Sequence, residues 1–188
     1  RQRQMCIRDS LATVALFVPV GFYDATLDRY LTDMGASNTL ISFAFLAFGI
    51  PFALLASRGG RTADRVGPLR AAVAASVLMV PITMGYGFVT VPMLVVVLSG
   101  IEGVVQSLGA PAAQALVASG APTGRAAAAQ GLAGAGSLVV GVVAAYMAGA
   151  LYESIGARGM FAIAGGGIAL FMAIALAQGR MRRPAPVS

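Results

Sequence analysis

Glu102 is the residue of this 188-residue sequence whose position most strongly suggests chemistry. It lies near the middle of the apolar segment 92–112, and Gln106 follows four residues later, on the same face of a helix. A carboxylate in apolar surroundings holds its proton more tightly than one in water, which suits proton uptake and release near neutral pH. We therefore predict that Glu102 binds a proton or a solute, with Gln106 beside it.

Three more charged candidates lie in the apolar segment 11–31. Asp24 lies inside the segment, and Asp28 and Arg29 follow about one turn later, near its end. A hydrogen bond between Asp24 and a neighbouring helix and a role in transport account equally well for an acid at this position. Solvation or pairing at the membrane interface is the simpler explanation for Asp28 and Arg29, and a transport role is the alternative.

Several classes of chemistry are missing from this sequence. It contains no His, which excludes His-dependent triads and His metal sites, and its single Cys excludes an internal disulfide. No Ser–Lys or carboxylate pair indicates an intramembrane enzyme, and no ring-forming selectivity motif indicates a channel. We expect no enzyme activity, no catalytic residue, no metal and no cofactor.

The composition is that of a membrane protein. Hydrophobic residues make up 58% of the chain and charged residues 11%, against about 25% charged in soluble domains. The net charge of +6 comes entirely from Arg and could indicate nucleic-acid binding. The Arg residues lie in short breaks between apolar blocks, however, so we expect a lipid bilayer as partner and no nucleic acid.

Six apolar blocks are long enough to cross a membrane, which takes about 20 helical residues. We predict an all-α membrane protein with spans at 11–31, 38–57, 69–89, 92–112, 126–150 and 158–178. The first and fourth blocks both carry a buried acid. This favours two inverted three-helix repeats, a plan in which the binding site lies between the repeats. The row Gly141, Ala145 and Gly149 predicts close helix packing.

The Arg residues predict the orientation. With the N-terminus inside, only Arg29 and Arg158 fall on the outer side. Cytoplasmic segments hold eight others: Arg58, Arg61, Arg65, Arg70, Arg125, Arg180, Arg182 and Arg183. This is the positive-inside pattern, so we expect a multi-pass plasma-membrane protein with both termini, including the tail 181–188, in the cytoplasm.

The break at 57–68 carries the most specific pattern. Gly60, Asp64, Arg65, Gly67 and Arg70 resemble the cytoplasmic signature loop of the major facilitator superfamily. The two glycines suit tight turns, and the aspartate can pair with Arg or lie at a helix N-terminus. A solvated basic loop is the simpler alternative.

The strings DMGAS, PAAQ and LYESIG extend the resemblance over 11–180. It implies a twelve-helix transporter made of two six-helix halves. Ser99 stands where the N-terminal half of such transporters usually has Arg, Pro68 replaces a basic signature residue, and 126–150 lacks Pro. These departures favour the C-terminal half, with the N-terminal six-helix half as the missing partner. Residues 1–10, RQRQMCIRDS, resemble a translated sequencing adaptor, and we expect them to be a non-native leader.

The functional expectation is a secondary active transporter, or permease, that moves a small-molecule substrate by alternating access, with proton-coupled efflux as the finer hypothesis. The alternative is a membrane assembly or regulatory subunit that keeps the fold but does not transport. The sequence specifies no substrate.

Overall fold

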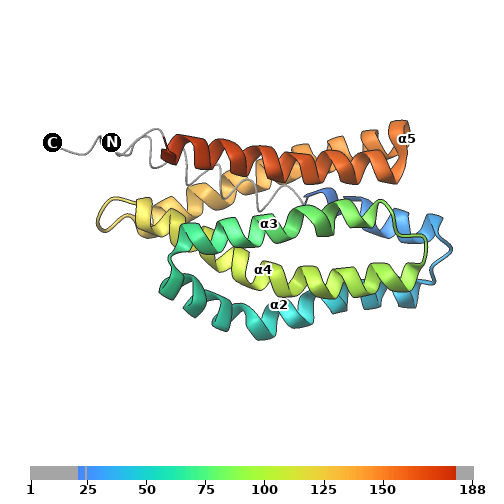
Figure 1. The fold of residues 1–188 in the computed structure, drawn as a ribbon, viewed down its shortest axis with the longest axis horizontal. Helices are drawn as coiled ribbons and strands as arrows, with labels where there is room; N and C mark the ends of the chain where they lie inside the picture. The colour runs from blue at the N-terminus through green and yellow to red at the C-terminus, as the bar shows by residue number, and fades with distance from the viewer. Residues whose placement is uncertain (1–20, 24, 181–188) are drawn as a thin grey trace.

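The computed structural model describes residues 21–23 and 25–180, and every regular element within them is a helix. A first helix ends at Asp33, and α2 (Asn38–Val66), α3 (Pro68–Tyr86), α4 (Pro92–Gly120) and α5 (Ala126–Arg180) follow. Figure 1 shows α3 lying lengthwise between α4 and α5, and α3 contacts both. Most of the predicted first span, 11–31, lies outside the described residues.

Four helices are long and apolar enough to cross a membrane: α2, α3, α4 and residues 126–177 of α5. The chain is therefore an integral membrane protein by the length and composition of its described helices. Gly156, with φ 73° and ψ 177°, interrupts α5 and divides it into two arms. The ribbon reverses direction there, so the arms run back along the molecule in opposite senses (Figure 1).

The predicted loop at 57–68 is wrong. α2 continues to Val66, so Gly60, Asp64 and Arg65 lie on a helix and Arg70 lies in the first turn of α3. Only Gly67, with φ 96°, stands between the two helices, as the turn prediction for that glycine required. Arg, Thr and Ala between 58 and 66 are compatible with a helix, and no Pro interrupts it before Pro68. The charged residues in this segment therefore lie in the last turns of α2 and not in a loop.

α4 also runs further than expected. The sequence predicts a span that ends at residue 112, but α4 passes through Pro111 and ends at Gly120. The residues after Pro111 are mostly Ala and Leu, which form helices readily. A Pro inside a membrane helix is tolerated when neighbouring groups satisfy the freed carbonyl.

Two cores of different character hold the bundle together. One is aromatic and contains Tyr23, Tyr30, Tyr86 and Phe161. The other lies where α2, α3 and α4 meet the end of α5, and alanines such as Ala72, Ala75 and Ala112 dominate it. Small side chains let helix backbones approach closely, so this second region can pack without bulky residues.

Candidate functional site

Glu102 lies inside the bundle, with 4% of its surface exposed. The Tyr86 hydroxyl donates a hydrogen bond to its Oε2 atom at 2.9 Å and lies 3.1 Å from the Ser99 hydroxyl. Tyr86 is fully buried at the end of α3, while Ser99 and Glu102 are one turn apart on α4. The acid is thus held by a side chain from a neighbouring helix.

A second tyrosine from the first helix extends this polar cluster. The Tyr23 hydroxyl donates to the hydroxyl oxygen of Thr83 at 3.3 Å, and the Tyr23 and Tyr86 rings lie edge to face with their centroids 5.0 Å apart. Phe161, from the second arm of α5, lies 5.4 Å from the Tyr86 ring. Three helices besides α4 therefore enclose the neighbourhood of Glu102.

Helical spacing explains why these groups meet. On α3 the polar residues Ser76, Thr83 and Tyr86 are all buried, and Thr83 and Tyr86 are three residues apart. On α4, Glu102 and Gln106 are both buried on one face, as the four-residue spacing predicted. Polar side chains on these helices turn toward each other and away from the lipid-facing surface.

The other candidates from the first helix are not brought to Glu102. Arg29 forms an ion pair with Glu153 of α5 at 2.9 Å, and both side chains are largely exposed. Asp28 is exposed and is not the partner of Arg29. Asp24 lies outside the described residues.

Sequence reasoning left two members of this cluster without a role. The sequence does not single out Tyr86, and Ser99 stands out in it only as a departure from a family motif. A signal for Tyr86 was present, since Thr83 and Tyr86 form a polar pair at helical spacing in an otherwise apolar segment. Which residue of α4 they would face depends on the packing of two helices, which spacing alone does not determine.

The residues of the expected signature loop lie elsewhere. Asp64, Arg65 and Arg70 are exposed near the junction of α2 and α3, and no ion pair between described residues involves Asp64. No group of three or more His, Cys, Asp or Glu able to hold a metal occurs within the part of the chain that the structure describes.

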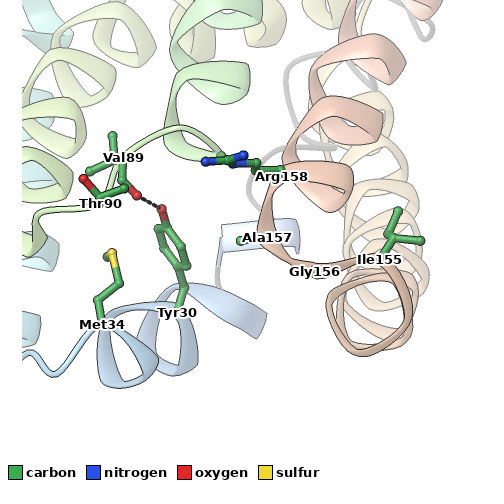
Figure 2. A pocket seen from close by; sticks show the side chains of 9 residues that line it. Tyr30, Met34, Val89, Thr90, Ile155, Gly156, Ala157 and Arg158 are labelled. Carbon is green, nitrogen blue, oxygen red and sulfur yellow. Dashed lines mark hydrogen bonds between the residues drawn. The ribbon is translucent and has the colours of Figure 1, made fainter.

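An open pocket of about 470 Å³ lies near the polar cluster, where the first helix, the α3–α4 turn and the Gly156 turn meet. Figure 2 shows Tyr30 in this pocket, with its hydroxyl directed at the α3–α4 turn. That hydroxyl donates to the carbonyl oxygens of Tyr86 and Val89. Tyr86 therefore links the two regions, because its carbonyl oxygen accepts from the pocket-lining Tyr30 and its hydroxyl donates to Glu102.

Comparison with known protein families identifies the family of this sequence. The family model described as Major Facilitator Superfamily matches residues 10–188. The chain belongs to the major facilitator superfamily. This confirms the resemblance found at 11–180, although Gly60, Asp64, Arg65 and Arg70 lie on helices and only Gly67 lies between them. Superfamily members are secondary transporters and not enzymes, so membership places the chain in a transporter family. No curated protein matches the sequence.

Proposed function

We propose that this superfamily member forms part of a secondary active transporter that moves a small solute by alternating access, with Glu102 as the group that binds a proton during the cycle. The observation that carries the proposal is the buried Glu102 carboxylate, held by Tyr86 and flanked by Ser99, within a bundle of membrane helices. Proton-coupled efflux is the mode that we expect.

The cost of burying an acid supports a functional role. A carboxyl group inside a membrane protein is disfavoured by several kcal/mol, depending on how much water and polar contact it keeps. A Gln at this position would accept the same hydrogen bond from Tyr86 without an ionisable group. The structural contact alone therefore does not account for an acid, whereas reversible protonation requires one.

The same proposal includes six membrane crossings. The two arms of α5 would each cross once, and a crossing at 11–31 would add to those of α2, α3 and α4. The first helix and α4 would then be equivalent members of two inverted three-helix repeats. In agreement with this plan, both contribute to the polar cluster, through Tyr23 and Glu102.

A second six-helix half would complete the transporter. Only 11% of the most apolar window of α2 is buried, against 39–44% for the other three candidate spans. The first arm of α5 likewise exposes large side chains, including Leu132, Leu138 and Tyr146. We infer that the N-terminal half covers part of these two surfaces and that lipid covers the rest.

The test is Glu102→Gln in the full-length protein, reconstituted in liposomes with an imposed pH gradient. Uptake of a sugar, an amino acid and the cationic dye ethidium is measured, each at several pH values. We expect the variant to fold and to lose pH-driven transport of whichever probe the wild type carries. Glu153→Gln is the matched control, because Glu153 is exposed and pairs with Arg29 away from the cluster.

Two results would count against the proposal. Unchanged pH-driven transport by Glu102→Gln would remove the role of this acid. Absence of flux for every probe with the wild-type protein would instead favour the alternative of a non-transporting assembly or regulatory subunit.

A further inference from the structure

Arg158 lines the open pocket and has an unusual set of contacts. Its guanidinium lies 5.8 Å from the centroid of the Phe88 ring, and it forms no ion pair with any carboxylate among the described residues. Figure 2 shows the side chain extending from the second arm of α5 toward the α3–α4 turn. A cation–π contact holds a guanidinium in place without using its N–H donors. Those donors therefore remain available to a ligand.

Arg29 provides an internal comparison. It also lies against an aromatic ring, 5.3 Å from the centroid of Tyr152, and it pairs in addition with Glu153 at 2.9 Å. The two arginines thus share the aromatic contact but differ in the counter-ion. For Arg158 the corresponding anion is not supplied by the described part of the chain.

The rest of the pocket selects for negative charge. None of its lining residues is acidic, so it offers no counter-charge to a cation. The Tyr30 hydroxyl already donates to backbone carbonyls, whereas the Thr90 hydroxyl forms no hydrogen bond with the described residues and can act as a second donor. The second arm of α5 starts directly after Gly156, so its positive N-terminal end also borders the pocket.

We propose that this pocket binds an oxyanion, a carboxylate or a phosphate group, through the Arg158 guanidinium and the Thr90 hydroxyl. Met34 and Ile155 also line the pocket, so the ligand can carry an apolar portion beside its anionic group. The same chemistry is offered by a free solute and by the phosphate of a lipid headgroup. Binding here does not depend on protonation of Glu102, so this site and the proposed transport site can be tested separately.

The experiment measures thermal unfolding of the purified full-length protein in a neutral detergent at constant ionic strength. Three anions are titrated: inorganic phosphate, hexanoate and dioctanoyl phosphatidylglycerol, with dioctanoylglycerol as the uncharged comparator. A ligand that binds only the folded state raises the melting temperature in a saturable way. We expect at least one anion to do so, while the comparator does not.

Arg158→Gln should raise the half-saturating concentration by about tenfold or more, because a charge-assisted contact is lost. Thr90→Ala should raise it less, and Arg29→Gln, which removes the same charge from the paired arginine, should leave it unchanged. Stabilisation by phosphate or hexanoate identifies a solute site, and stabilisation by the phosphatidylglycerol alone identifies a lipid site. Equal stabilisation of Arg158→Gln and wild type, or no stabilisation of wild type by any anion, would overturn the proposal.

Discussion

Tyr86 connects the polar cluster around Glu102 with the open pocket. Its hydroxyl contacts Glu102 and Ser99, and its backbone carbonyl accepts the hydrogen bond from Tyr30, which lines the open pocket. Tyr23 makes a simpler contact, since among the described residues its hydroxyl donates to the neutral Thr83, at the longer distance of 3.3 Å. The two tyrosines share the aromatic cluster, so their hydroxyl groups can be compared directly.

Tyr86→Phe should therefore destabilise the protein more than Tyr23→Phe. Removing the Tyr86 hydroxyl deprives a buried carboxyl oxygen of one donor, at a cost of about 1–2 kcal/mol. The loss at Tyr23 should be below about 1 kcal/mol, because both partners are neutral and the contact is long. Thermal unfolding in detergent, followed by circular dichroism, measures both. Equal melting temperatures for the two variants would show that the contact with Glu102 adds no stability.

Close approach between α2 and α4 depends on glycine. A Cβ atom at Gly103 would overlap the carbonyl oxygen of Phe48, and one at Gly59 would overlap that of Ser107. By contrast, a Cβ at Gly149 would meet nothing within 4 Å. Within the described residues, the closest backbone approach thus lies between α2 and α4. The predicted packing on the first arm of α5 is confirmed at Gly141, because a Cβ at Gly21 would overlap the Gly141 carbonyl oxygen.

Gly103→Ala should separate α2 from α4 and lower stability by about 1–3 kcal/mol, as overpacking does. Gly100→Ala is the matched control on the same helix, because its Cβ would lie 3.6 Å from the Ala47 carbonyl oxygen, an ordinary contact distance. We expect that variant to remain within about 1 kcal/mol of wild type. Denaturation midpoints in detergent compare the two. A Gly103→Ala protein as stable as Gly100→Ala would show that the two helices can adjust their spacing freely.

At the scale of the whole molecule, the turns fall at two ends of a lengthwise bundle. The Gly156 turn and the α3–α4 turn meet at the pocket, and the exposed arginines near the α2–α3 junction belong to the other end in the predicted orientation. This separation makes the orientation accessible to chemical labelling.

Single-cysteine variants should reveal the two sides. In a Cys6→Ser background, Ser154→Cys should react with a membrane-impermeant maleimide added to intact cells, because Ser154 is exposed beside the Gly156 turn. Thr123→Cys, in the exposed turn between α4 and α5, should react only after the cells are made permeable. The reverse pattern of labelling would place both termini outside and refute the prediction from the arginines.

The sequence was sufficient for the features that depend on local pattern. Apolar block length predicted membrane helices, and the four-residue spacing placed Glu102 and Gln106 on one buried face. Features that depend on contacts between helices cannot be predicted from local pattern, and the hydrogen bond from Tyr86 to Glu102 is one of them. The helix end at Val66 differs from the predicted end at residue 57 for another reason, because polar residues predict a loop there although no residue before Pro68 stops the helix.

The uninterrupted course of α2 has a mechanical consequence. Its 29 residues extend about 43 Å, more than the roughly 30 Å of a hydrocarbon layer. In the predicted orientation, an upright α2 would project into the cytoplasmic headgroup region at its Arg-bearing end. Arg58, Arg61 and Arg65 lie on this end of the helix and not on a flexible loop. A tilt of α2 would therefore move all three charges together, and its energy would depend on the charge of the surrounding lipid headgroups.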